Sequence, residues 1–139
     1  MIETISQLVA RVESNDQLGS YRFEPKYKPD PRAFSLARKF NPGIFSQASF
    51  DVLLASSWGR YQIMGDNLYL QGLDTSIMIF WSSGSLQSLA FSRYVKSRGI
   101  DYSLSEILHD EEKRRRFALR YNGSVKYAER MMQIYEAAK

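Results

Sequence analysis

The chain has 139 residues, of which 44% are hydrophobic and 24% charged, and it carries a formal net charge of +4 with a pI near 9.4. This length suits one domain with its own core, and the composition excludes a disordered or membrane-embedded chain. There is no cysteine, which excludes a thiolate nucleophile, a disulfide framework and a cysteine-ligated zinc site. The single histidine, His109, cannot build a metal site alone.

The first part of the chain combines a helical pattern with a proline-rich segment. Apolar residues recur on one face over residues 2–13, so we expect an amphipathic helix that closes at Glu13. Residues 15–31 hold three of the four prolines, which predicts an irregular loop or small hairpin with a short strand at Tyr21 to Glu24.

The middle of the chain is expected to form three further helices and one ambiguous element. Asp30-Pro31 has the form of an N-cap followed by proline at the first helical position. Residues 47–56 continue the helical pattern, and residues 61–68 repeat apolar side chains at helical spacing before Gly72. Residues 75–81 are apolar enough to be buried, but their short length fits a helix or a strand.

Three segments in the last part of the chain carry clear helix signals. Leu86 to Val95 presents one apolar face, and Ser103-Leu-Ser-Glu106 has the form of a capping box. Asp110 can cap the next helix, and a final helix is expected from about Lys126. The sum is a mainly α single domain over residues 1–139, with about seven short helices and little or no sheet.

Carboxylates are the residues left for acid or base chemistry. Glu13 follows an apolar helical face, so its carboxyl is expected to be partly buried, which raises the pKa and keeps a proton available for donation. Glu24 lies between Phe23 and a proline in the loop and is a candidate second acid, or simply a partner for a neighbouring lysine. Asp51 is a third candidate, and its position also suits an ordinary helix face.

Four short motifs occur together in this chain: VES with Glu13, SSWGRYQIMG at 56–65, FALRYNG at 117–123 and YAERMMQIYE at 127–136. Their order resembles lysozyme-like peptidoglycan-cleaving domains, above all phage endolysin N-acetylmuramidases and bacterial lytic transglycosylases. The resemblance implies that Gln62 projects from a helix into a sugar-binding cleft, that Ser57 lines the same cleft, and that Tyr121 and Asn122 lie near Glu13 and the glycan.

The activity implied by this resemblance is cleavage of peptidoglycan between N-acetylmuramic acid and N-acetylglucosamine, with Glu13 as general acid. A second carboxylate, Glu24 or Asp51, would place water for hydrolysis. Without it, the muramyl 6-hydroxyl would attack instead, as in a lytic transglycosylase that forms 1,6-anhydro products. A non-catalytic basic module that binds nucleic acid or cell wall is a further alternative, since the pI is high and residues 113–116 are all basic.

The leading interpretation names bacterial peptidoglycan as the partner of a monomer, with no metal, cofactor, nucleic acid or stable membrane association. No charged segment followed by an apolar run opens the chain, so we expect synthesis in a bacterial cytoplasm without a signal peptide. The protein would then reach the cell wall in the periplasm after release by another component, or as part of a phage particle.

Overall fold

The computed structural model describes all residues 1–139, and it contains nine helices and one small sheet. The elements in chain order are α1 (Ile5–Ser14), β1 (Tyr21–Phe23), α2 (Ala33–Phe40), α3 (Gln47–Leu54), β2 (Ser56–Trp58), β3 (Ile63–Met64), α4 (Gly65–Leu70), α5 (Ile77–Trp81), α6 (Gly84–Ser97), α7 (Leu104–His109), α8 (Glu111–Asn122) and α9 (Lys126–Ala137). The predicted mainly α, lysozyme-like fold class is confirmed.

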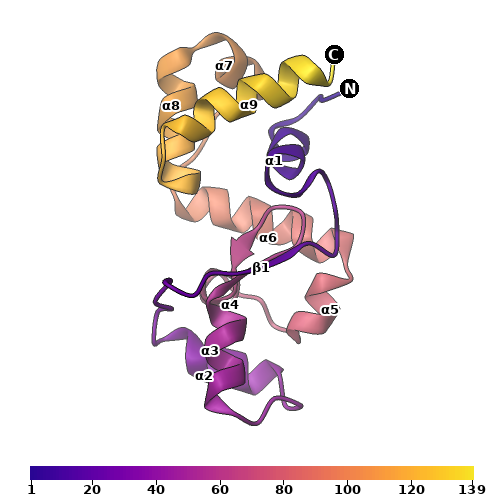
Figure 1. The fold of residues 1–139 in the computed structure, drawn as a ribbon, viewed down its shortest axis with the longest axis vertical. Helices are drawn as coiled ribbons and strands as arrows, with labels where there is room; N and C mark the ends of the chain where they lie inside the picture. The colour runs from indigo at the N-terminus through magenta and orange to yellow at the C-terminus, as the bar shows by residue number, and fades with distance from the viewer.

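The helices form two groups at opposite ends of an elongated molecule (Figure 1). The terminal lobe consists of α1, α7, α8 and α9, in which α9 packs against both α1 and α8, and both chain termini lie there. The group at the other end is named the central lobe after its position in the sequence. It consists of α2, α3, α4 and the sheet, and α2 packs there against α3 and α4. Helix α6 runs between the two lobes and contacts α4 and α5.

The sheet joins two distant parts of the sequence. Strand β2 pairs antiparallel with β1 on one side, where Arg22 lies opposite Ser57, and with β3 on the other, where Ser57 lies opposite Met64. The short strand expected at Tyr21 to Glu24 is confirmed as Tyr21–Phe23. Its partner is β2, so the hairpin of this fold is formed by residues 56–64 and not by residues 15–31.

The helix predicted over residues 61–68 is wrong in its first half. Residues 59–62 form the turn of the hairpin, and α4 begins only at Gly65. The backbone explains the difference, because Gly59 and Gln62 adopt left-handed conformations with φ of 80° and 50°. A right-handed helix cannot pass through such residues.

The helix ends agree better with the sequence signals. Ser103 and Glu106 form the predicted capping box of α7, and the Asp110 side chain accepts a hydrogen bond from the Lys113 amide at the start of α8. The ambiguous apolar segment forms α5. Asp30 does not cap α2, which begins at Ala33, two residues later than the proline signal suggests.

One hydrophobic core extends through both lobes. Its fully buried large side chains come from α1, α3, α4, α5, α7, α8 and α9 and include Leu8, Leu54, Tyr69, Phe80, Ile107, Phe117 and Met131. Among the helices, none has the length and apolar character needed to cross a bilayer.

Candidate active site

A cleft of about 800 Å³ is lined by six of the seven candidate residues that the sequence analysis selected. These residues are Glu13, Glu24, Ser57, Gln62, Tyr121 and Asn122. They come from α1, the end of β1, the hairpin and the end of α8, so four separate segments meet there. The cleft is open to solvent and mostly polar, which suits a hydroxyl-rich ligand better than an apolar one.

Glu13 occupies the last turn of α1, next to buried Val12, and its own side chain is half-buried. Burial raises its pKa from the ordinary 4.5 to about 7, because a charged carboxylate is poorly solvated there. Three groups act against this shift: the Tyr127 hydroxyl, then the positive charges of Arg130 and Arg22. The carboxyl is therefore available in both protonation states near neutral pH.

Among the neighbouring groups, the Tyr127 hydroxyl lowers the pKa of Glu13 most. It is buried and makes no hydrogen bond of normal geometry in the structure, yet it lies close enough to favour the charged form of Glu13. The sequence analysis placed this residue at the start of the final helix and did not select it for the site. A buried tyrosine usually needs a hydrogen-bond partner, and this requirement could have indicated a polar contact of Tyr127.

The end of α1 is fixed to the hairpin by the residue that follows Glu13. The Ser14 hydroxyl donates to the Arg60 carbonyl at 2.9 Å. Asn15 then adopts a left-handed conformation with φ of 53°, and its amide donates back to the Arg11 carbonyl at 3.1 Å, which ends the helix. Glu13 is thus held at a helix end that is tied to the opposite wall.

Gln62 lines the cleft, but it projects from the hairpin turn and not from a helix. Its Nε2 donates to the Gly59 carbonyl at 2.8 Å, and its Oε1 accepts from the Ser57 hydroxyl at 2.7 Å. An amide side chain has two N–H groups and two acceptor lone pairs. One of each therefore remains for a ligand while the other two hold the turn.

Tyr121 lies near Glu13, as the resemblance implied, but its hydroxyl has another partner. It donates to the Tyr61 carbonyl at 2.8 Å, in a buried position between α8 and the hairpin turn. Burial, followed by the negative charge of Glu13, raises the pKa of Tyr121 far above its ordinary value. Tyr121 therefore positions the turn, whereas Asn122 is exposed at the cleft edge.

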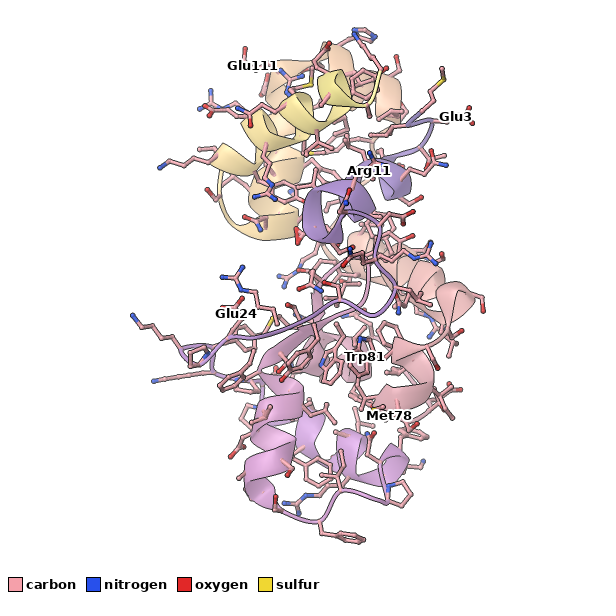
Figure 2. All side chains as sticks on the ribbon, turned by 45° about the vertical axis from the view of Figure 1, so that its right-hand side comes forward. Glu3, Arg11, Glu24, Met78, Trp81 and Glu111 are labelled. Atoms are coloured by element: carbon pink, nitrogen blue, oxygen red, sulfur yellow. The ribbon has the colours of Figure 1, made fainter.

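Glu24 is the second carboxylate of the cleft, and Asp51 is not. Figure 2 shows Glu24 on the extended segment that crosses the middle of the molecule. Its amide donates to the Ala55 carbonyl at 3.0 Å, and its carboxylate forms an ion pair with the Arg22 Nε at 3.0 Å. Asp51 lies exposed on α3, accepts a hydrogen bond from Gln47, and does not line the cleft.

The loop after Glu24 is anchored by a carboxylate that the sequence analysis did not select. Asp66 is buried on α4 and accepts hydrogen bonds from the Tyr27 hydroxyl at 2.8 Å and from the Asp30 amide at 2.9 Å. Sequence spacing gave no sign of this contact, because 36 residues separate Asp66 from Asp30. The loop therefore has a fixed path along one side of the cleft.

Comparison with known proteins relates this chain to one enzyme family. A family model described as N-acetylmuramidase matches residues 37–139. The chain is also similar to a protein named endolysin from Enterobacteria phage PRD1, with 33% identity over 140 residues that cover 94% of this chain and 93% of the phage protein. No solved structure matches. Glu13 and Glu24 both precede the segment that the family model matches.

Proposed function

Because the chain belongs to the N-acetylmuramidase family, we propose that it cleaves peptidoglycan with Glu13 as the general acid. The observation that carries this proposal is a half-buried carboxyl with a pKa of about 7 inside an open polar cleft. A general acid works best when its pKa lies near the working pH, since it must be protonated and still give up its proton readily.

The reaction begins at the bond between N-acetylmuramic acid and N-acetylglucosamine. Glu13 gives its proton to the glycosidic oxygen, the bond from that oxygen to the anomeric carbon breaks, and positive charge develops on the sugar. Glu13 is then a carboxylate, which the Tyr127 hydroxyl and the Arg130 guanidinium stabilise. The same groups that limit the rise of its pKa therefore support the charged state that follows proton transfer.

Glu24 is the candidate for the second carboxylate. In hydrolysis it would take a proton from a water molecule while the water oxygen bonds to the anomeric carbon. Its ion pair with Arg22 is solvent-exposed, and exposed pairs are held together by only about 0 to 1 kcal/mol. Glu24 can therefore exchange Arg22 for a water molecule at small cost.

The alternative is a lytic transglycosylase, in which the muramyl 6-hydroxyl attacks the anomeric carbon and no second carboxylate is needed. One feature favours it: the Glu24 carboxylate is already paired with Arg22. The two mechanisms are separated by mass spectrometry of the released fragments. Hydrolysis gives a free reducing muramyl end, whereas transglycosylation gives a product lighter by one water.

The experiment compares wild type with Glu13→Gln and Glu24→Gln on purified cell walls. We expect Glu13→Gln to remove activity by about 10²- to 10⁴-fold with unchanged circular dichroism. We expect Glu24→Gln to reduce hydrolysis strongly as well. An anhydro product whose rate is unaffected by Glu24→Gln would assign the transglycosylase mechanism, and full activity in Glu13→Gln would reject Glu13 as the acid.

The basic run at residues 113–116 gives little support to a nucleic-acid module. Lys113 pairs with Glu106, Arg116 pairs with Glu112, and Arg114 donates to two carbonyls at the end of α7. Contacts of this kind are common on solvent-exposed helix faces. We further propose that the enzyme is a monomer that acts on the bacterial cell wall, and that another component or a phage particle delivers it there.

A further inference from the structure

The cleft contains more positive than negative charge. Three arginines line it, Arg22, Arg98 and Arg120, together with the two carboxylates Glu13 and Glu24. When Glu13 is protonated, as a general acid must be, three guanidinium groups face a single carboxylate. A glycan made only of neutral sugars gives no reason for this excess.

Two of these arginines have no acidic partner. Arg22 pairs with Glu24, but no carboxylate lies within 4.0 Å of the Arg98 or Arg120 guanidinium. Both residues lie at helix C-termini, where the helix dipole favours a cation by about 0.3 to 1 kcal/mol. That effect accounts for a basic residue at each helix end, but it leaves the hydrogen-bond donors of both side chains largely unused.

Neutral contacts hold the two guanidinium groups close to the same turn. The Arg120 Nη1 donates to the Gly99 carbonyl at 2.9 Å, and Gly99 directly follows Arg98 in the chain. The Arg98 guanidinium lies over the Tyr94 ring, 5.1 Å from its centre. Arg120 thus uses one of its five N–H groups for a backbone oxygen, and the Arg98 guanidinium has only a cation–π contact with the Tyr94 ring.

The space beside Arg98 continues beyond the cleft. A second hollow of about 740 Å³ shares Tyr27, Asn67 and Arg98 with the cleft. Its further charged residues are Lys28, Asp66 and the ion pair of Arg32 with Asp30. A substituent that branches from a sugar in the cleft therefore has a second space, beside Arg98, into which it can extend.

Resting on the proposed function, we infer that Arg98 and Arg120 form a subsite for a carboxylate carried by the muramyl residue of the substrate. A guanidinium group matches a carboxylate geometrically, with two parallel N–H donors to two oxygens. Peptidoglycan offers this group in two forms: the carboxylates of the peptide stem, or the lactyl carboxylate itself where the stem has been removed. The adjoining hollow gives room for the longer stem.

Three substrates with the same sugar backbone test this subsite. They are stem-bearing glycan strands, amidase-stripped strands with free lactyl carboxylates, and stripped strands whose lactyl carboxylates are blocked as methylamides. The variants are Arg98→Gln and Arg120→Gln, with Lys96→Gln as a control that removes one charge from the same turn of α6 outside the cleft. The readout is the ratio of kcat/KM on each anionic substrate to kcat/KM on the blocked strands.

We expect each arginine variant to lower this ratio by about tenfold, through KM, which corresponds to about 1.4 kcal/mol. A drop confined to stem-bearing strands assigns the stem carboxylates, and a drop confined to stripped strands assigns the free lactyl carboxylate. A drop on both substrates means that the subsite accepts either carboxylate. The effect should shrink at high salt, since the groups are exposed. Lys96→Gln should leave the ratio at the wild-type value.

Two results would overturn the inference: a ratio in both arginine variants equal to that of Lys96→Gln, or equal losses on all three substrates. Arg98→Gln carries the test if Arg120→Gln fails to fold, because Arg98 is exposed and makes no hydrogen bond through its side chain to the rest of the chain. Failure of the proposed function is a different result, since it would appear as retained cleavage by Glu13→Gln on every substrate.

Discussion

Replacement of Glu13 by glutamine should inactivate the enzyme and, above pH 7, stabilise its fold. The carboxyl has a pKa of about 7 in the folded protein because it is poorly solvated, whereas in the unfolded chain its value is 4.5. As pH rises from 4.5 to 7, the unfolded chain loses this proton first. The wild-type free energy of unfolding therefore falls across this window, and glutamine, which cannot ionise, removes that contribution.

The size of the effect follows from the pKa shift. Each unit corresponds to about 1.4 kcal/mol, so a rise from 4.5 to about 7 sets a ceiling of roughly 3 kcal/mol. Glu13 is half-buried, and screening by solvent reduces this figure to roughly 1 to 2 kcal/mol. The difference in free energy of unfolding between Glu13→Gln and wild type should grow by that amount from pH 4 to pH 8.

Urea unfolding at a series of pH values measures this difference directly. Titration of all other groups is common to both proteins and cancels when one curve is subtracted from the other. A difference that stays constant from pH 4 to pH 8 would show that the carboxyl is well solvated. The physical basis for Glu13 as a proton donor would then be lost, whatever the variant does to activity.

Two further substitutions test the surroundings of the site. Tyr127→Phe removes a hydroxyl that lowers the pKa of Glu13, so the alkaline limb of the pH–kcat profile should move to higher pH, and an unchanged limb would rule out the contact. Gly59→Ala should destabilise the fold by about 2 to 4 kcal/mol in thermal melts, because φ is 80° and the new Cβ would lie 2.5 Å from the Gln87 Oε1. Gly19→Ala is the matched control with no atom within 4 Å, and equal melting temperatures for the two variants would contradict the packing argument.

The sequence was a good guide where structure depends on nearby residues. The capping box at Ser103 and the cap at Asp110 bind amides three residues away, so their spacing alone identifies them. The position of Glu13 at a helix end was predictable in the same way. Its carboxyl is buried by residues of its own helix and of α9, and only the first of these was visible in the local pattern.

The hairpin was missed because its stability comes from remote partners. Residues 61–68 carry apolar side chains at helical spacing, and that pattern favoured a helix. The turn is instead held by Ser14, Gln87 and Tyr121, which lie between 27 and 60 residues away in the chain. Such contacts leave no periodic trace in the sequence, and the same holds for the proximity of the Tyr127 hydroxyl to Glu13.

The same three contacts also determine how freely the two walls of the cleft can move. The Arg60 carbonyl accepts from Ser14 of α1, the Tyr61 carbonyl accepts from Tyr121 of α8, and the Arg60 amide donates to Gln87 of α6. Opening of the cleft at this turn would break one buried and two partly buried hydrogen bonds, and a buried group left without its partner costs about 1 to 3 kcal/mol. The terminal lobe and the hairpin should therefore move as one body around Glu13. Substrate must then enter from the open side between Glu24 and the ends of α6 and α8, without a hinge motion of the lobes.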